Sequence, residues 1–400
     1  MQSPADRPRL TVVSPFLDKR HGTERCVAEQ IERLSEIYEI HLYSERVQDV
    51  DLRNIKWHRV PMPPGPHLLR YVGWFLANHA LRWRDRYFRA LVPDVVYSPG
   101  VNCLDADVIC VHIVFGEFSE QVHEAFKLAR SPLKTWPVIV HRRLYYWLIE
   151  SLERHVYRNE RVFLAAVSQK TARAVVKYCG RKGTVKVVYD GLDLQQFNPS
   201  RREAMRLAAR ATLALPDDAV VVLLIGNDWK TKGLPCLLEA ASRLRLHGPR
   251  LRLLVVGHDT ASPYQETIRC FDMSGQVTFL PLRSDVEFYY AAADVYAGPS
   301  RDDSFAMPPA EAMACGLPAI TTRMAGVSEI ITHGEDGLIL EDPDDAQTLS
   351  EWLGRLATDV DWRNRMGAAA ARTAEQYTWE QNALQMRSLF DRAIIARDTA

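Results

Sequence analysis

The 400-residue sequence has no excess of charge of either sign, because 50 lysines and arginines balance 50 aspartates and glutamates. A neutral balance gives no electrostatic reason to expect a nucleic acid partner. Internal repeats and low-complexity linkers are also missing. The composition, 47% hydrophobic and 25% charged, is that of an ordinary globular protein. Since 400 residues exceed the size at which one core stops growing, we expect two domains.

Cysteine is sparse, and its spacing excludes two classes of small scaffold. None of the seven cysteines forms a C-x-x-C pair, so neither a zinc knuckle nor a disulfide framework is expected. Scattered reduced thiols are typical of cytosolic proteins. The first ten residues lack an apolar signal core, and no run approaches about 18 apolar residues. We therefore expect a cytoplasmic chain whose only membrane contact is peripheral, on the inner face of the cell membrane.

Two common nucleotide-binding motifs are absent. No G-x-x-x-x-G-K-[ST] sequence is present, so the chain is not a P-loop protein. No G-x-G-x-x-G follows the first strand expected in either half, which disfavours a nicotinamide-dependent dehydrogenase.

Short apolar runs alternate with segments of helical periodicity along the whole chain. The strands expected in the first half are 10–16, 38–44, 55–61, 94–98, 107–115, 163–168 and 185–191. Those expected in the second half are 220–226, 251–257, 277–280, 294–300 and 319–322. Strands buried on both faces and separated by helices predict doubly wound parallel sheets of the α/β class. Such sheets bind ligands at the carboxyl ends of their strands, so a cleft between two stacked halves is the expected site.

The boundary falls in polar, proline-containing sequence. We assign 1–195 to an N-terminal Rossmann-like domain and 196–377 to a C-terminal one. A final helix, 378–400, is expected to pack on either half, including back on the N-terminal domain.

The segment 302–320 is the most informative part of the chain. It places Asp303 and Glu311 on either side of a predicted helix start, with two prolines in the first turn and Gly316 as a left-handed stop. Asp303 could simply cap this helix, and Glu311 could face solvent. However, Glu311 lies in an otherwise apolar stretch, where a carboxylate without a partner is costly. A ligand diol, such as a ribose, would explain it.

Three further loops follow predicted strands. Gly22 opens a helix and allows close backbone approach of a phosphate or an acceptor hydroxyl, or belongs to an ordinary turn. His112 ends a buried strand, as a core histidine or as a hydrogen-bond partner of a sugar hydroxyl. Lys230 and Lys232 precede Gly233, either as surface lysines or as a site that neutralises a diphosphate leaving group.

The order of these motifs resembles the retaining glycosyltransferases of family 4, which have the GT-B fold. The resemblance covers nearly the whole chain and is strongest over 187–345. The residues that match the family pattern are Asp190, Gly191, Asp193, Phe197, Pro199, Lys232, Gly233, Asp303, Glu311, Ala312, Ala314, Gly316, Pro318, Gly326 and Glu329.

The resemblance implies a hexosyltransferase with catalytic roles for Asp303, Lys232 and His112. The implied donor-binding residues are Gly22, Asn227, Lys230, Phe305, Ala306 and Glu311. In this scheme Glu311 binds the ribose, Lys232 holds the diphosphate, and Asp303 and His112 contact the donor sugar. The anomeric configuration is retained, no metal or other cofactor is needed, and the leaving phosphate takes the acceptor proton.

Four positions depart from the family pattern. Asp303 is one methylene shorter than the usual glutamate, and Asn227 stands where many members carry an arginine. His21 replaces the first glycine of a Gly-Gly pair, and Asp190 replaces an asparagine. Lys232 and Glu311 are retained, so we expect an active enzyme, and the departures leave room for a different donor sugar.

The expected acceptor domain, 1–195, contains two segments rich in aromatic and basic residues. The first segment, 61–89, contains Leu68, Leu69, Arg70, Tyr71, Trp74, Phe75, Arg82, Trp83, Arg84, Arg86, Tyr87, Phe88 and Arg89. The second, 125–149, lacks acidic residues and contains Lys127, Arg130, Lys134, Trp136, Arg142, Arg143, Tyr145, Tyr146 and Trp147. These residues either pack on the first sheet or seat the protein on anionic lipid. The second interpretation predicts a glycan, lipid-linked or lipopolysaccharide-like acceptor of cell-envelope synthesis.

Two other functions remain open from the sequence. One is a sugar-nucleotide epimerase of the same architecture, and the other is a non-catalytic paralogue that binds a nucleotide sugar.

Overall fold

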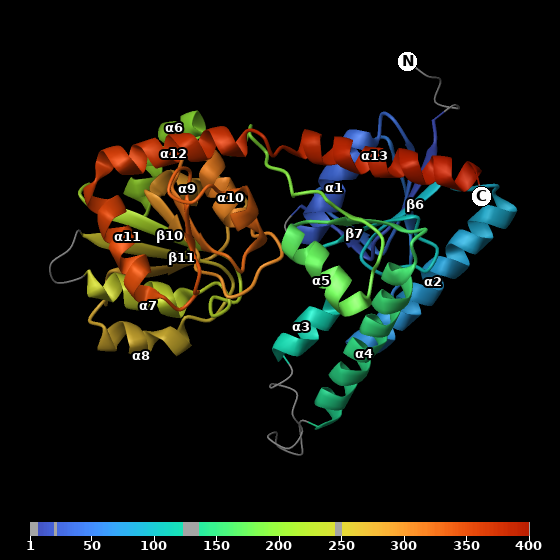
Figure 1. Cartoon of the computed structure of the whole chain (residues 1–400), viewed down its shortest axis with the longest axis horizontal. Coiled ribbons are helices and arrows are strands. Elements are labelled where there is room, and N and C mark those ends of the chain that lie inside the picture. Colours follow the sequence, from blue (N-terminus) through green and yellow to red (C-terminus); the bar gives the residue numbers. More distant parts are fainter. Residues whose placement is uncertain (1–6, 20–21, 123–135, 245–249, 400) are drawn as a thin grey trace. The chain divides into compact units, whose positions relative to one another are not determined.

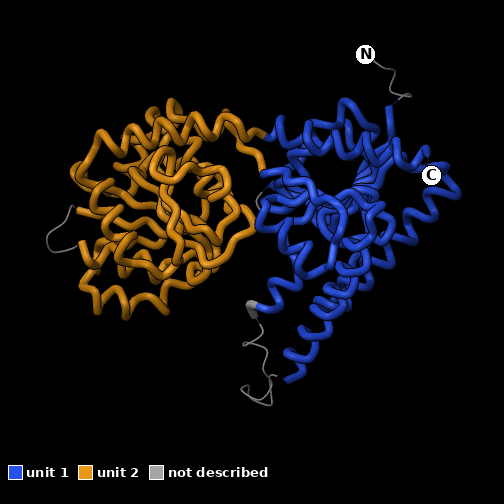
Figure 2. Tube along the Cα trace, in the orientation of Figure 1, with its two compact units in different colours: residues 1–189, 379–400 blue, residues 190–378 orange. Residues whose placement is uncertain are grey.

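The computed structural model describes residues 7–19, 22–122, 136–244 and 250–399. The chain forms two compact units (Figure 2). Unit 1 consists of Met1–Tyr189 together with Trp379–Ala400, and unit 2 consists of Asp190–Thr378. The final helix, α13 (Trp379–Asp398), therefore belongs to the same unit as the first part of the chain.

Unit 1 is built on a seven-stranded parallel sheet (Figure 1). In spatial order its strands are β5 (Ile55–Arg59), β3 (Glu39–Ser44), β1 (Arg9–Val13), β6 (Val95–Pro99), β7 (Val108–Val111), β8 (Phe163–Ala166) and β9 (Val185–Val187). One group of helices packs together and against this sheet: α2 (His67–Phe88), α4 (Trp136–Arg158), α5 (Gln169–Cys179) and the shorter α3 (Phe115–Val122). A second pair, α1 (Gly22–Leu34) and α13, packs together and supplies another part of the core.

Unit 2 repeats this plan with a six-stranded parallel sheet. Its strands are β12 (Val277–Leu280), β11 (Leu251–Val256), β10 (Val220–Ile225), β13 (Val295–Ala297), β14 (Ala319–Thr322) and β15 (Leu338–Leu340). The helices of unit 2 are α6 (Pro199–Thr212), α7 (Leu234–Arg243), α8 (Ser262–Cys270), α9 (Glu287–Ala292), α10 (Met307–Ala314), α11 (Ala346–Thr358) and α12 (Val360–Ala374). The prediction of two doubly wound parallel-sheet domains is confirmed.

The strand order locates the ligand-binding edge of each sheet. When the strands of each main sheet are numbered in chain order, both sheets have the spatial order 3-2-1-4-5-6, and the sheet of unit 1 adds a seventh strand at the end. The second and third strands therefore lie on one side of the first strand, and the fourth strand lies on the other side of it. Loops that follow these two strands diverge and leave a crevice, which is the usual ligand site of doubly wound sheets. In unit 1 these strands are β1 and β6, and in unit 2 they are β10 and β13.

Several strand predictions were too long, and two of them bear on the site in unit 1. The run 10–16 divides into β1 and the two-residue β2 (Phe16–Leu17), which pairs with β4 (Arg46–Val47) in a separate small sheet. Pro15 lies at the break and has no N–H to donate to a ladder. The run 107–115 ends as a strand at Val111, so His112 lies in the loop beyond the carboxyl end of β7.

A polar cluster at the edge of the first sheet links two strands and a helix. His41 Nδ1 lies 2.9 Å from His58 Nε2, so only one of these facing nitrogens carries a proton. Asp85 accepts a hydrogen bond from the hydroxyl of Tyr43 and lies 3.6 Å from His58 Nδ1. His41 Nε2 lies 3.3 Å from Glu39. Burial lowers the pKa of both histidines.

This cluster predicts a loss of stability in mild acid. A histidine whose pKa is lowered by folding binds fewer protons in the folded than in the unfolded state. Its contribution is fully present above the unfolded pKa of about 6.5 and is lost as the pH falls through the lower folded value. We expect urea unfolding of the wild type to require less urea at pH 5.5 than at pH 7.5, and the difference to shrink in His58→Gln. The exposed His155 provides a control, since His155→Gln should keep the wild-type pH dependence. An unchanged pH dependence in His58→Gln would contradict the prediction.

Candidate active site

The loops after β10 and β13 bring two predicted residues together in unit 2. Lys232 lies in the loop that follows β10, and its Nζ forms an ion pair with Oδ2 of Asp303, in the loop after β13. Both side chains are partly buried. The amine and the carboxylate thus stand at the edge where the strand order predicts a ligand. An ammonium in this position can neutralise a phosphate, and a carboxylate can accept bonds from sugar hydroxyls.

Glycine determines how closely the Lys232 loop approaches the sheet. Gly233 has φ of +85°, in the left-handed region, and begins α7 as its cap. A Cβ at this position would lie 2.0 Å from the carbonyl oxygen of Pro299, which no side chain tolerates. The stem of Lys232 folds over Gly226, where a Cβ would lie 3.2 Å from Lys232 Cε. The Lys-Gly pair is therefore a packing requirement as well as a chemical motif.

Asn227 and Lys230 occupy the outer part of the same loop. Asn227 Oδ1 accepts the backbone N–H of His258 at 2.9 Å, which ties this loop to the one after β11. Lys230 is exposed at the surface. The side chain of Asn227 therefore has a structural contact in addition to any contact with a ligand.

Glu311 is buried on α10, with 4% of its surface exposed. Its Oε2 accepts a hydrogen bond of 2.8 Å from the hydroxyl of Tyr290. Tyr290 in turn packs edge to face on Phe197, with ring centroids 5.7 Å apart. The premise that Glu311 has no protein partner was wrong: a tyrosine on α9, which the spacing of motifs does not reveal, already holds this carboxylate.

The matched motif around Phe197 acts as a support for the site. Phe197 is fully buried behind Tyr290, and Pro199 begins α6, which Asn198 caps. A Cβ at Gly316, whose φ is +73°, would lie 3.3 Å from Pro199 Cγ. These contacts position α9 and α10 relative to one another, and so position Glu311.

The chain before α10 has an unusual backbone conformation. Ala306 adopts φ of +73°, which is uncommon for a residue with a side chain. The N–H of Val327 donates to the carbonyl of Phe305, and both Phe305 and Ala306 are buried. The two prolines of the first turn have no N–H groups, so the anion-binding capacity of this helix start is restricted to the remaining amides.

Tyr296 is a further residue at this edge that the sequence analysis did not select. Burial, together with the nearby charges of Asp303 and Glu311, raises its pKa. The charges of both predicted acids therefore act on the pKa of the same tyrosine. It lies at the centre of β13, where sequence alone suggests only a buried strand.

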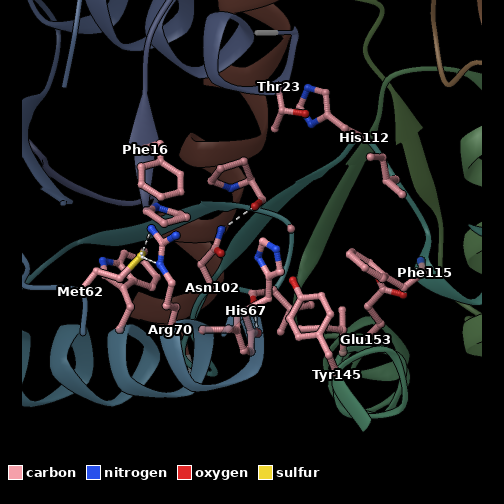
Figure 3. Close-up of a pocket in the computed structure, with 18 residues that line it drawn as sticks. Phe16, Thr23, Met62, His67, Arg70, Asn102, His112, Phe115, Tyr145 and Glu153 are labelled. Atoms are coloured by element: carbon pink, nitrogen blue, oxygen red, sulfur yellow. Dashed lines mark hydrogen bonds between the residues drawn. The ribbon is translucent and has the colours of Figure 1, made fainter. Parts of the chain in front are cut away.

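Unit 1 carries its own cavity at the corresponding edge, with a volume of about 370 Å³ (Figure 3). Strand β2 contributes Phe16, the loops after β6 and β7 contribute Asn102 and His112, and α3 contributes Phe115. Helices α2 and α4 contribute Arg70, Tyr145 and Glu153.

The lining of this cavity is largely aromatic, with a few charged groups. Tyr71 and Tyr145 meet edge to face at 5.9 Å, and the hydroxyl of Tyr71 donates to the carbonyl of Val101. The guanidinium of Arg70 lies 3.1–3.3 Å from the sulfur of Met62. Such a lining fits a ligand that presents both a ring face and an anionic group.

Glu153 is the most perturbed acid of this cavity. Burial raises its pKa to about 8, although it accepts the backbone N–H of Phe115 at 2.9 Å. Near neutral pH its carboxyl is therefore largely protonated and can donate a hydrogen bond. The sequence placed Glu153 in a helix without any sign of a special role.

Gly22 and His112 both lie at this edge. Gly22 is exposed as the first residue of α1. Among the described residues beyond its chain neighbours, no heavy atom lies within 4 Å of the place of a Cβ, and Thr23 lines the cavity. His112 is 8% exposed and also lines the cavity. The neighbouring His21 is outside the described residues. The predicted residues therefore fall into two groups, one in each unit.

Comparisons with known proteins agree with this architecture. Residues 205–373 match the family described as Glycosyl transferases group 1. The chain is 32% identical over 249 residues to a D-inositol 3-phosphate glycosyltransferase of Corynebacterium urealyticum, covering 60% of this chain and 58% of that protein. It is 31% identical over 230 residues to the protein of the same description from Thermobifida fusca, covering 54% and 52%. The matches thus span little more than half the length of these relatives.

Solved structures show the same fold. WaaG, a glycosyltransferase involved in lipopolysaccharide biosynthesis, superposes with a TM-score of 0.74 at 17% identity, covering 94% of this chain and 98% of WaaG. Anabaena Alr3699/HepE, in a complex with UDP and glucose, gives a TM-score of 0.70 at 18% identity, covering 95% and 98%. The fold is therefore GT-B. The segment that contains Lys232, Asp303 and Glu311 is similar to the group 1 glycosyl transferases.

Proposed function

We propose that this protein transfers a sugar from a nucleoside-diphosphate donor to a hydroxyl of its acceptor, with retention of configuration. The observation that carries the proposal is the pairing of Lys232 with Asp303 at the ligand-binding edge of unit 2. Since the group 1 glycosyl transferases match this unit, a nucleotide sugar is the ligand class that best suits these groups. HepE, which shares the fold, is described in complexes with UDP and with UDP-glucose.

Each donor group has a proposed partner. Glu311, held by Tyr290, accepts hydrogen bonds from the ribose diol, and Lys232 neutralises the diphosphate as it leaves. Asp303 contacts hydroxyls of the donor sugar. Other groups contribute to the phosphate environment: Lys230, Asn227, the amides at Phe305 and Ala306, and Gly22. His112 contacts the sugar.

The bond changes balance without a metal. The bond between the anomeric carbon and the diphosphate oxygen breaks, and the acceptor oxygen bonds to the same face of that carbon. The proton of the acceptor hydroxyl moves to the departing phosphate. Lys232 is paired with Asp303 before the donor binds, so the diphosphate replaces part of an interaction that already exists.

The cavity of unit 1 is proposed to hold the acceptor. Its aromatic walls suit the face of a sugar or cyclitol ring, and Arg70 suits a phosphate or other anion. The curated relatives are described as D-inositol 3-phosphate glycosyltransferases, whose acceptor has this chemistry. A phosphorylated glycan or lipid-linked acceptor also fits.

The exposed side of α4 supports contact with a membrane surface. Four apolar residues of α4 are exposed at helical spacing: Trp136 (39%), Val140 (43%), Leu144 (51%) and Trp147 (64%). Arg143 and Arg154 are exposed on the same helix. This stripe, which we call the α4 stripe, has the apolar and basic character of a surface that docks on anionic lipid. Among the described helices, none is long and apolar enough to cross a membrane.

Other members of the predicted lipid surface have different roles. Trp74 is buried in the core, and Tyr71 and Tyr145 line the cavity. Arg82 is nearly buried and pairs with Asp105. The candidates Lys127, Arg130 and Lys134 are outside the described residues. On α2, in contrast, Leu69, Trp83, Tyr87 and Phe88 are exposed, so the α4 stripe is one of two apolar surfaces that could contact lipid.

Donor binding separates the proposed enzyme from the alternatives. We expect calorimetric titration with UDP-, GDP- and ADP-sugars to show binding of one nucleotide class, at least about tenfold weaker in Glu311→Gln and Lys232→Ala. Tyr290→Phe should also weaken binding about tenfold, because a hydrogen bond to a charged group contributes about 1.5–3 kcal/mol. Glu239→Gln, an exposed carboxylate on α7, is the matched control.

The outcomes of this titration decide between three functions. Slow donor hydrolysis that Glu311→Ala abolishes supports transfer. Interconversion of the bound sugar without an acceptor supports an epimerase, and binding without turnover supports a non-catalytic paralogue. Absence of binding to every donor would overturn the proposed function.

The raised pKa of Glu153 predicts a pH dependence on the acceptor side. Below pH about 8 its carboxyl is protonated and donates to the acceptor, and above that pH it is ionised and repels an anionic acceptor. We expect the acceptor KM to rise above pH about 8 in the wild type and to remain flat in Glu153→Gln, whose amide stays neutral. Glu160→Gln, an exposed glutamate beyond the end of α4, should keep the wild-type profile. A rise in KM that persists in Glu153→Gln would refute this role.

The α4 stripe predicts binding to anionic vesicles. At low salt, we expect the protein to co-sediment with vesicles that contain an anionic phospholipid, and added salt should weaken binding. The double variant Leu144→Ser/Trp147→Ser should bind at least about tenfold more weakly, since burying each such side chain contributes about 1.5–3 kcal/mol. Trp57→Ser removes an exposed tryptophan elsewhere in unit 1 and should have no effect. Equal sedimentation of the double variant and the wild type would rule out the stripe.

A further inference from the structure

Three side chains that metals favour meet inside unit 1. Cys26 lies on α1, Cys110 lies on β7, and His112 follows that strand directly. One ligand atom from each, the two sulfurs and a ring nitrogen, lies within 4.8 Å of the other two. All three residues are buried. The cysteines are 84 positions apart in sequence (110 minus 26), so only the fold brings them together.

We propose that Cys26, Cys110 and His112 bind a zinc ion. Two sulfurs and one imidazole nitrogen form a ligand set that suits zinc and disfavours magnesium or calcium. In a tetrahedral site, with Zn–S distances near 2.3 Å, two thiolate sulfurs stand about 3.8 Å apart. The three ligand atoms lie within 4.8 Å of one another, a spacing from which side-chain rotation can bring them around one ion.

The surroundings of Cys26 match the outer shell of a thiolate ligand. The amide nitrogen of Gln30, one turn later on α1, donates a hydrogen bond of 3.2 Å to Cys26 Sγ. The amide oxygen of Gln30 accepts from the hydroxyl of Tyr97 at 2.6 Å, which fixes its orientation. Asn382, on α13, accepts a second bond from the Gln30 nitrogen at 2.9 Å. A fully buried glutamine thus presents a donor to the sulfur, as partners of metal ligands commonly do.

The position of His112 beside the cavity determines which ligands could reach a bound ion. His112 lines the 370 Å³ cavity (Figure 3), so one member of the cluster borders the cavity. An ion held here has three protein ligands, and its fourth position is available to water or to a small group from the cavity. The transfer reaction does not require this ion, because the Lys232–Asp303 pair belongs to unit 2. His112 is shared with the proposed function, so the test of the site relies on metal binding and not on activity.

Cobalt(II) titration of the full-length, reduced protein tests the site directly. Tetrahedral thiolate coordination of cobalt gives strong absorption in the red and a sulfur-to-metal band in the near ultraviolet, and zinc should abolish both. We expect one cobalt per chain, with affinity lowered more than about 100-fold in Cys26→Ser and Cys110→Ser. Gln30→Leu should lower it about 10–100-fold through loss of the outer-shell bond. Cys103→Ser, a buried cysteine of the same unit, is the control and should bind as the wild type.

A second measurement keeps the test valid if a cysteine variant fails to fold. In the wild type, zinc should protect Cys26 and Cys110 from alkylation, as followed by peptide mass spectrometry. The exposed Cys270 should react at the same rate with and without zinc. Absence of the cobalt bands, their persistence in folded Cys26→Ser, or alkylation of the two cysteines at a rate independent of zinc would overturn the proposal.

Discussion

The divergence of the chain around the central strands of its two sheets is the constraint on which the rest of the molecule depends. In each unit the first and fourth long strands are neighbours, and the loops that follow them leave in opposite directions. In unit 2 this brings Lys232 to Asp303 across 71 positions of sequence. In unit 1 the same arrangement opens a cavity lined by loops that follow the strands and by neighbouring helices. The side chains at the two edges differ, but in both units the same strand order produces the ligand-binding edge.

The positions of the polar groups depend on the aromatic residues and glycines that pack next to them. Phe197 packs on Tyr290, which holds Glu311, and Gly233 allows the Lys232 loop to touch the backbone at Pro299. Family motifs usually regarded as binding signatures are thus partly packing requirements. Replacing such a residue would move a ligand group without removing it.

Much of this could be predicted from sequence because the signals are local. The alternation of short apolar runs with helices indicated both sheets, and the proline–glycine punctuation around α10 defined that helix within a residue or two. The divided strand at Pro15 and the end of β7 before His112 were missed, since a run of apolar residues does not show where ladder pairing stops. The motifs at Lys232, Asp303 and Glu311 were selected from their order along the chain and their resemblance to a family pattern. Tyr290, Tyr296 and Glu153 were not, because each is an ordinary residue of an ordinary helix or strand until its neighbours are known.

The sequence by itself determined the α/β class and the two-domain plan, since periodicity along the chain expresses both, and it supplied the residue types that we propose for the donor site. Only the tertiary structure decided which of these residues touch. It paired Lys232 with Asp303, gave Glu311 a tyrosine partner, and gathered Cys26, Cys110 and His112 from a helix, a strand and the following loop. The physical reason is that proximity, burial and pKa depend on contacts between distant segments. A carboxyl such as Glu153 acquires its raised pKa only from the apolar surroundings that folding builds around it.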